Sequence, residues 1–289
     1  MHRRNSSACL GGLVTTIWGD AGAHGNATAA GEGALYPNLI SCPERMKWIG
    51  ASLASDYWAL DRAFRSRPFS TRQAQGIMGG PPGQRNLRLS RLAHAGWLAR
   101  IGRGRYAALG PLWVRSRPDD PLASFRMASF FPELAIATAL TVRTFGPRLR
   151  SLALFGSCAR GSERPDSDID LLVIADPIPS TLAARIDELH PIVEEATEFA
   201  LDRRQHGQGT HIPQIVLLAP EELRAEPPLL LDLTQDARIL FDPEDLLRGV
   251  LDRLRGKLER LGSRRVRAPE GWEYWVLKPG ARVGEVEEV

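Results

Sequence analysis

Residues 151–176 read SLALFGSCARGSERPDSDIDLLVIAD, and this stretch decides the fold of the second half of the chain. The apolar run Leu152 to Phe155 predicts a short strand that ends at Gly156-Ser157. A polar loop follows, and Asp168 to Ile174 predicts a second strand. Side chains two residues apart on a strand share a face, so Asp168 and Asp170 present two carboxylates side by side.

This pair of carboxylates indicates a metal site. Two adjacent like charges repel unless a cation neutralises them, and Mg²⁺ (or Mn²⁺) takes one or two carboxylates together with phosphate oxygens and water. Gly156 allows the backbone to approach a phosphate chain closely in a strained turn, and Ser157 offers an N–H and a hydroxyl to phosphate oxygens. The stretch therefore predicts a phosphate-binding turn that faces a divalent cation.

The spacing of Gly-Ser, ten residues and Asp-x-Asp resembles the signature of the DNA polymerase beta nucleotidyltransferase superfamily and its minimal, MntA-like members. Two further elements of that signature stand here as Ala159-Arg160-Gly161 and Ser167-Asp168-Ile169-Asp170-Leu171. The resemblance implies transfer of a nucleoside monophosphate, AMP from ATP in the first instance, to a protein or RNA acceptor. It also implies the site residues: Asp168 and Asp170 as catalytic and metal-binding, with Gly156, Ser157 and Arg160 binding the nucleotide. For Arg160, a role in loop structure stays open.

The superfamily normally adds a third carboxylate on a neighbouring central strand, which we place at Ile212 to Leu218. The position that aligns with this acid is Gln214, and an amide cannot serve as a base at neutral pH. Two alternatives follow from this difference. Either an acid of the preceding helix reaches the site, or the chemistry is slow or lost; the candidate acids are Glu194, Glu195 and Asp202.

A second module is indicated by charge. Between Lys47 and Arg117 there are thirteen basic and two acidic residues, a formal charge of +11 in a chain whose total is +3. A field of this sign attracts polyanions such as nucleic acids. The remainder of the chain is correspondingly acidic, with a formal charge of −8.

The same segment predicts three helices and a hairpin. Helical spacing begins near Ser55, Ser70 is typical of an N-cap for a helix over 71–77, and a turn over 78–83 precedes a helix over 85–95. Two short strands, 96–101 and 105–109, enclose a turn rich in glycine and arginine. This order is typical of a winged helix-turn-helix, and residues 69–109 resemble the winged helices that accompany toxin–antitoxin and nucleotidyltransferase systems.

In such a module, the third helix and the hairpin would contact DNA or RNA. Leu89 and Leu92 are expected to face the core. The alternative is a protein-interaction module whose arginines are merely solvated. The predicted nucleic-acid-binding residues are Arg85, Arg88, Arg91, Arg103 and Arg105.

The remaining segments carry weaker signals. Residues 1–45 lack periodicity, which predicts disorder or a mis-annotated start, with Met46 as the true start. The helical patterns over 132–145 and 242–261 are amphipathic; the second, with Asp242 and Pro243 at its start, is expected to pack on the sheet, with a homodimer interface as the alternative. His206 and His211 flank a glycine-rich turn without a third metal ligand nearby, so a loop pair is preferred to a metal site.

Composition excludes several classes of protein. No stretch has the roughly 20 apolar residues that a membrane helix needs, so no membrane role is expected. Three widely spaced cysteines form no disulfide framework or zinc site and favour a reducing, cytoplasmic compartment.

We expect an α+β protein: a winged helix-turn-helix over 50–115, a small mixed-sheet nucleotidyltransferase domain over 125–225, and a helical extension with a terminal strand over 226–289. The first function hypothesis is a nucleotidyltransferase, with an antitoxin that modifies a toxin partner as a specific case. The rival hypothesis is a DNA-binding regulator whose nucleotidyltransferase domain senses nucleotide and is catalytically weak.

Overall fold

The N-terminal part of the fold is a winged helix-turn-helix, as expected. The structure is a computed structural model that describes residues 51–110, 121–269 and 273–280. The expectations for residues 1–45 and for most of the predicted linker therefore lie outside the described residues. All described residues belong to one unit that spans Pro43–Val289. Its first elements, in chain order, are α1 (Ala51–Phe64), β1 (Phe69–Ser70), α2 (Thr71–Ile77), α3 (Pro82–His94), β2 (Leu98–Gly102) and β3 (Arg105–Ala108).

Local sequence explains these bounds. The Ser70 hydroxyl accepts the backbone N–H of Gln73, whose side chain accepts the N–H of Ser70, so α2 starts with a complete capping box. Helix α3 begins three residues earlier than predicted, because Pro82 suits the first helical position, where no N–H is required. Leu89 and Leu92 face the core as expected, beside Trp97.

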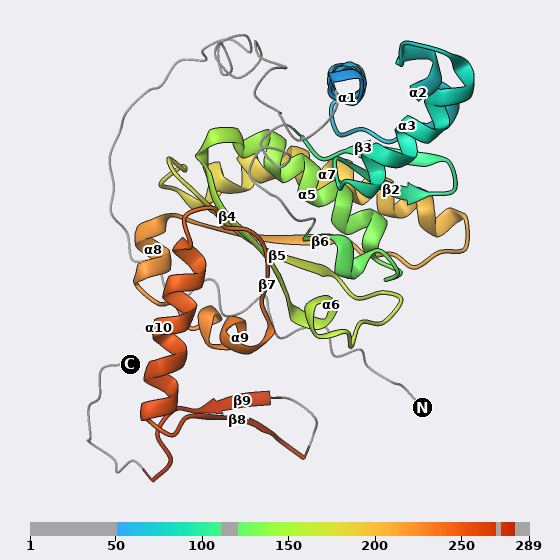
Figure 1. Ribbon diagram of the computed structural model, residues 1–289. Coiled ribbons are helices and arrows are strands. Elements are labelled where there is room, and N and C mark those ends of the chain that lie inside the picture. Colours follow the sequence, from blue (N-terminus) through green and yellow to red (C-terminus); the bar gives the residue numbers. More distant parts are fainter. Residues whose placement is uncertain (1–50, 111–120, 270–272, 281–289) are drawn as a thin grey trace. The chain divides into compact units, whose positions relative to one another are not determined.

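Helix α5 (Phe131–Phe145) corrects the expectation of an amphipathic helix. Every residue in it except Arg143 and Thr144 is buried. One side meets apolar residues of β2 and β3, among them Ala99 and Ile101, and the other side meets the central sheet and α7 (Leu182–Gln205). A helix that is apolar all round belongs in an interior, and α5 lies between the winged helix and the sheet (Figure 1).

The central sheet is mixed and has the order β6-β5-β4-β7. Strands β4 and β5 are antiparallel, β5 and β6 are parallel, and β4 and β7 are antiparallel. Strand β6, expected to be central, lies at an edge. The strand bounds are β4 (Leu149–Phe155), β5 (Ile169–Ala175), β6 (Pro213–Leu218) and β7 (Arg238–Phe241).

Alternation along β4 and β5 divides the core into two apolar layers. Leu154 and Leu171 face the layer with α5 and α7, whereas Ala153 and Leu172 face the layer with α9 and α10. The chain is therefore built as helices on both sides of a sheet (Figure 1). The elements that complete it are the short helices η2 (Ala123–Phe125), η3 (Gly146–Arg148) and α6 (Gly156–Arg160), then α8 (Pro220–Arg224), α9 (Leu229–Asp236), α10 (Leu246–Arg260), β8 (Arg264–Arg267) and β9 (Glu273–Val276).

The C-terminal helix packs on the sheet as expected. The buried side chains of α10 join one cluster with residues of β4, β5, α8 and α9; they are Leu247, Val250, Leu251, Leu254 and Leu258. The helix begins at Leu246, four residues later than predicted, and the Asp242 carboxylate accepts the backbone N–H groups of residues 247 and 248 at 3.2 and 2.9 Å. After α10 the chain forms the antiparallel pair β8–β9.

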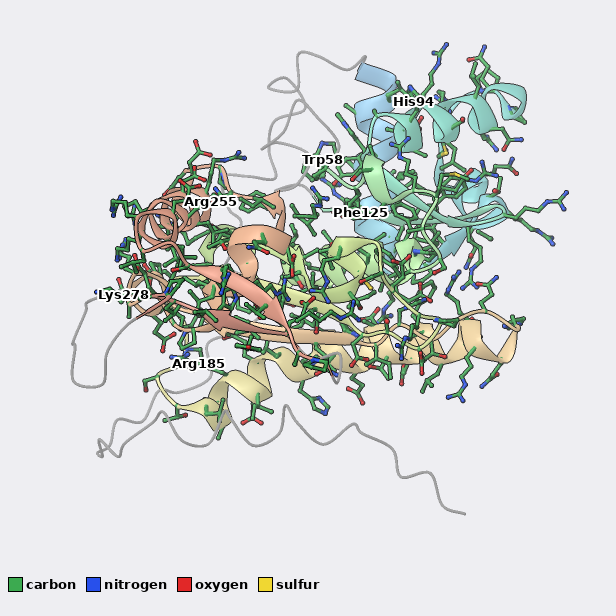
Figure 2. The ribbon with its side chains drawn as sticks, turned by 90° about the horizontal axis from the view of Figure 1, so that it is seen from below. Trp58, His94, Phe125, Arg185, Arg255 and Lys278 are labelled. Carbon is green, nitrogen blue, oxygen red and sulfur yellow. The ribbon has the colours of Figure 1, made fainter. Side chains whose placement is uncertain are left out.

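Arginines tie the helices to one another. Arg185 on α7 makes a two-pronged ion pair with Glu222 of α8, with both N–O distances at 2.9 Å. Arg255 on α10 donates to the carbonyl of Thr234 on α9; Figure 2 labels both arginines. The hydrogen bonds and charge of Arg185 hold the pKa of Glu222 below its usual value, although burial opposes this. No helix in the described part of the chain is long and apolar enough to cross a membrane.

Candidate functional site

The two carboxylates that the sequence singled out lie beside the glycine turn. Phe155, the last residue of β4, pairs with Asp170 on β5, so the chain enters α6 directly next to the Asp170 side chain. Gly156 has a φ of +73°, and a Cβ added to it would collide with an Asp170 carboxylate oxygen and lie 3.0 Å from its Cγ. Glycine is required at 156 for both its conformation and its lack of a side chain.

Ser157 and Cys158 belong to the same turn. Ser157 is the second residue of α6 and is half-buried next to Gly156. The Sγ of Cys158 lies 3.2 Å from the backbone carbonyl of Asp168, so α6 is tied to the start of β5. Burial, followed by the charges of Glu163 and Asp170, raises the pKa of Cys158 to about 12. The thiol is thus protonated at neutral pH and serves as a packing group rather than a nucleophile.

The carboxylate pair is electrostatically uncompensated. Burial raises the pKa of Asp170 to about 6, and the charge of Asp168 adds to this, while Arg160 acts in the opposite sense. Burial and Asp166 raise the pKa of Asp168, and His211 lowers it in part. Within the described residues, neither carboxylate forms an ion pair. The partly buried Asp170 carboxylate and the exposed Asp168 carboxylate beside it offer oxygen donors of the kind that suit a hard divalent ion such as Mg²⁺.

Arg160 has a structural partner. Its guanidinium donates to the Asp236 carboxylate at 2.7 Å, and Asp236 also accepts from Arg265 of β8 at 2.8 Å. Arg265 contacts Asp232 and Glu273 as well, and these acids raise its pKa although burial opposes them. Asp236 therefore links the turn at Gly156 to the C-terminal strand pair. Its two partners, Arg160 and Arg265, are 76 and 29 positions away in the sequence, so no local pattern predicts these contacts.

The third position of the expected triad is placed as the sequence aligned it. Gln214 on β6 pairs with Asp170 on β5, and its side chain is exposed. The three acids of α7 that could replace a carboxylate there are engaged elsewhere. Glu194 contacts His190 at 3.6 Å, Glu195 contacts Arg67 at 3.7 Å and Asp202 contacts Arg105 at 3.6 Å.

The two histidines lie apart in environment and role. His206 is exposed and its Nδ1 is 2.7 Å from the carbonyl of Asp202. His211 is fully buried and its Nδ1 is 2.8 Å from the carbonyl of Ser167. In the described part of the chain, no three residues of the types His, Cys, Asp and Glu are grouped to hold a metal ion.

The arginines predicted to form a cationic surface on α3 do not all lie at the surface. Arg88 points inward: its guanidinium is 3.2 Å from the buried Asp56 carboxylate and also donates to the carbonyl of Gly79. Its side chain is 13% exposed, so it cannot lie on the outer face as predicted. The reason is the buried acid Asp56, which needs a positive partner. Burial raises the pKa of Asp56, and the charge of Arg88 opposes this shift. Arg85 donates to the carbonyls of Gln75 and Gly80.

The hairpin arginines are divided in the same way. Arg105 lies over the ring of Phe199 and contacts Asp202, both on α7. Arg91 and Arg103 are exposed, and neither forms an ion pair with any residue that the structure describes. On α3, the exposed side chains near Arg91 include Leu87, at 53%. Of the five predicted residues, Arg91 and Arg103 present free charge at the surface.

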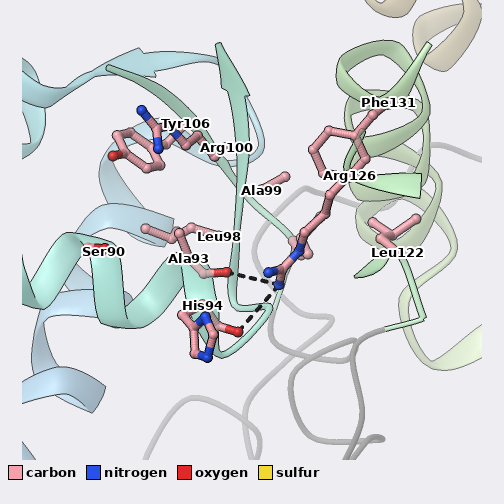
Figure 3. A pocket seen from close by; sticks show the side chains of 11 residues that line it. Ser90, Ala93, His94, Leu98, Ala99, Arg100, Tyr106, Leu122, Arg126 and Phe131 are labelled. Carbon is pink, nitrogen blue, oxygen red and sulfur yellow. Dashed lines mark hydrogen bonds between the residues drawn. The ribbon is translucent and has the colours of Figure 1, made fainter. Parts of the chain in front are cut away.

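A cavity of about 290 Å³ lies where α3 and the β2–β3 hairpin meet η2 and α5, away from the carboxylates. Figure 3 shows Arg126 reaching across it to the carbonyls of Ala93 and His94, each at 3.3 Å. These carbonyls are at the C-terminal end of α3, where a positive charge is favourable. Arg126 therefore fastens α3 to the segment before α5, a contact that no local pattern around residue 126 predicts.

The burial of Asp170 generates a prediction about stability. The pKa of Asp170 in the folded protein is about 6, above the usual 3.8. The contribution of this side chain to the free energy of unfolding is therefore most favourable below pH 3.8 and is lost as pH rises through 6. We expect Asp170→Asn to raise the unfolding temperature by about 2–4 °C at pH 8, equivalent to about 1 kcal/mol, because it removes a desolvated charge.

Calorimetry at pH 8 and pH 4 in the absence of divalent ions checks this, with Asp166→Asn as the control at an exposed carboxylate. At pH 4 the wild-type side chain is itself protonated in the folded state, so the gain should disappear. An equal gain at both pH values would mean that charge is not its cause.

Comparison with known proteins connects both modules to described families. Residues 139–205 match the model of the nucleotidyltransferase domain, a segment that contains Gly156, Asp168 and Asp170. Residues 59–108 match the model described as a transcriptional regulator, AbiEi antitoxin, which covers the winged helix.

The similar proteins include a putative protein adenylyltransferase from Methanocaldococcus jannaschii. It is 32% identical over 119 residues, which are 40% of this chain and 75% of the relative. Solved structures with weaker likeness are a toxin–antitoxin with AMP-PNP (18% identity, 44% of this chain and 90% of that chain, TM-score 0.29) and a mutant of the toxin–antitoxin MntA-HpeT (17% identity, 43% and 88%, TM-score 0.28). The chain belongs to the nucleotidyltransferase-domain family of the DNA polymerase beta superfamily and joins that domain to an N-terminal winged helix-turn-helix.

Proposed function

We propose that this protein transfers a nucleoside monophosphate, AMP from ATP in the first instance, to a hydroxyl of a protein or RNA acceptor. The observation that carries the proposal is the Asp168/Asp170 pair beside a glycine turn, inside the segment that matches the nucleotidyltransferase family. The relative described as a putative protein adenylyltransferase supports a protein acceptor. A toxin partner as that acceptor is the specific case.

In this proposal each residue of the turn has a task. Asp168 and Asp170 hold Mg²⁺ or Mn²⁺, which when bound stabilises charge on the transferred phosphate and on the leaving pyrophosphate. Gly156 keeps the turn low enough for the Asp170 carboxylate to remain beside it, and Ser157 donates to phosphate oxygens. Arg160 adds positive charge near Asp170, while Asp236 restrains its guanidinium.

Deprotonation of the acceptor is the weak point of the proposed chemistry. Gln214 occupies the place beside Asp170 where a carboxylate would help to activate the hydroxyl. Glu194, Glu195 and Asp202 pair with His190, Arg67 and Arg105 instead. We therefore propose slow turnover, limited by the acceptor rather than by nucleotide binding.

A transfer assay tests the proposal. Purified protein is incubated with α-labelled ATP or another NTP, Mg²⁺ or Mn²⁺, and cell lysate or RNA. Label should pass to an acceptor, and Asp168→Ala and Asp170→Ala should each reduce the rate at least a hundredfold, or about 2.7 kcal/mol of transition-state stabilisation. Tight nucleotide binding without any transfer by the wild type would contradict the enzyme.

The same assay separates the effect of Gln214. We expect Gln214→Asp to raise the transfer rate about tenfold, because it supplies a carboxylate in register with Asp170. Gln214→Asn is the matched control, since it shortens the side chain equally and keeps the amide. A rate that rises equally in both variants would show that side-chain length, and not charge, limits turnover.

Two glycines near the carboxylate pair, Gly156 and Gly161, provide a further prediction. Gly156→Ala should weaken nucleotide binding in the presence of Mg²⁺ about tenfold or more, because the new Cβ displaces the Asp170 carboxylate. Gly161→Ala is the control: its φ is +70°, so the backbone strain is similar, but nothing lies within 4 Å of its Cβ. Calorimetric titration should show near-normal binding for Gly161→Ala. Equal losses in the two variants would point to strain rather than collision.

A second candidate function is regulation of transcription through the winged helix. It is favoured by the match to a transcriptional-regulator model and by Arg91 and Arg103, which are exposed and form no ion pair with a described residue. In this case the nucleotidyltransferase domain binds nucleotide and turnover is incidental. DNA is the proposed partner, and the two functions are compatible in one chain, as an antitoxin that also represses its own gene would require.

Binding to a 30-base-pair duplex at several salt concentrations tests this function. We expect Arg91→Ala and Arg103→Ala each to lower affinity and to reduce the slope of log K against log salt by about 1, the value for one lost phosphate contact. Arg264→Ala, at an exposed arginine of β8, serves as the control. A salt-independent affinity, or equal effects from all three variants, would contradict DNA binding through the winged helix.

A further inference from the structure

His211 is buried beside the carboxylate pair and has no role in the function proposed above. It lies two residues before β6, and its imidazole is completely buried. The Nδ1 atom is 2.8 Å from the backbone carbonyl of Ser167, the residue that precedes Asp168. A carbonyl oxygen only accepts, so Nδ1 carries the proton and donates this hydrogen bond.

The hydrogen bond from His211 to Ser167 continues the connection between β5 and β6 beyond their last backbone hydrogen bond. The N–H of Ile169 donates to the carbonyl of Ile212 at 2.9 Å, and here the regular pairing of the strands begins. Asp168 lies just outside β5, where no ladder bond holds it. On the other side of His211, the N–H of Thr210 donates to the carbonyl of Pro165 at 2.8 Å. The imidazole thus bridges the interval between two backbone contacts.

The imidazole itself is held on its remaining sides. Nε2 is 3.5 Å from the Ser129 hydroxyl, which can donate to it when Nδ1 is the protonated nitrogen. The ring of Phe130 meets it edge to face at a centroid distance of 6.0 Å. A Cβ at Gly209 would come within 2.9 Å of Nε2, so only glycine leaves room for the ring there.

Asp168 is consequently restrained through the peptide groups on both of its sides. His211 holds the carbonyl of Ser167 before it, and the Cys158 thiol holds its own carbonyl after it. The Asp168 side chain remains exposed between these anchors. The backbone is fixed while the carboxylate stays free for a ligand.

We propose that His211 is a positioning residue that sets the direction of the Asp168 carboxylate through the Nδ1–H bond to Ser167. This inference rests on the proposed function, since it assumes that Asp168 and Asp170 bind a divalent ion. Groups that orient metal ligands typically contribute a factor of ten to a hundred to metal affinity. His211 would act in this way through the backbone rather than by contact with the ion.

Two amide substitutions separate positioning from packing. Asn places its amide nitrogen near the position of Nδ1, whereas Gln places it near the position of Nε2 and fills more of the cavity. We expect His211→Asn to retain Mn²⁺ affinity within about threefold and His211→Gln to lose about tenfold or more, measured by electron paramagnetic resonance of the free ion. A residue that only fills space would give the opposite order.

The full-length protein with Mn²⁺ alone is the probe, and unfolding temperatures verify that both variants fold. Asp168→Ala in the wild-type background establishes that the measured ion occupies this site. Wild-type protein that does not bind Mn²⁺ would overturn the metal chemistry of the proposed function. Binding by the wild type with equal affinity in the Asn and Gln variants, or higher affinity in Gln, would overturn the inference about His211 alone.

Amide hydrogen exchange gives a second readout that needs no metal. The N–H of Ile169, which donates to Ile212, should remain protected in His211→Asn and exchange faster in His211→Gln, because the end of the ladder loosens without the Ser167 bond. Equal protection in the two variants would also contradict the proposed role.

Discussion

The carboxylate of Asp170 lies against the backbone of Gly156, and the geometry of the surrounding site depends on this contact. The antiparallel pairing of β4 with β5 brings Phe155 opposite Asp170, so the chain has to turn away at the next residue. Only glycine combines the required φ of +73° with room for the carboxylate. The arrangement places the partly buried Asp170 carboxylate next to the charge of Asp168, which opposes folding. The apolar layers on both faces of the sheet supply the rigidity that maintains it.

Arginine serves two purposes in this protein, and sequence alone does not distinguish them. Arg88, Arg105 and Arg160 were all expected to bind an anionic ligand, and each one contacts an acid of the chain itself: Asp56, Asp202 and Asp236. These ion pairs connect segments far apart in sequence. A basic segment with a formal charge of +11 therefore presents less free charge than its composition suggests.

Local features of the fold could be predicted and long-range features could not. Ser70 followed by Gln73 predicts where α2 starts, and the alternation around Asp168 and Asp170 predicts β5, because the responsible contacts lie within a few residues. The burial of α5 escaped prediction because its second apolar face meets β2 and β3, whose arrangement its own periodicity does not encode. The ion pair between Arg265 and Asp236 also escaped prediction, because its partners are far apart in sequence. His211 has the sequence pattern of a loop residue, and only the parallel pairing of β5 and β6 brings it next to Ser167.

Because α5 is covered on both sides, the winged helix and the nucleotidyltransferase domain contribute to one common hydrophobic cluster. Ala99, Ile101 and Leu109 from the winged helix join the same cluster as Leu134 of α5 and Leu154 of the sheet. Cutting the chain between the two modules would uncover this apolar surface on each fragment. A fragment that contains the nucleotidyltransferase domain alone would lose the residues of β2 and β3 that cover one side of α5.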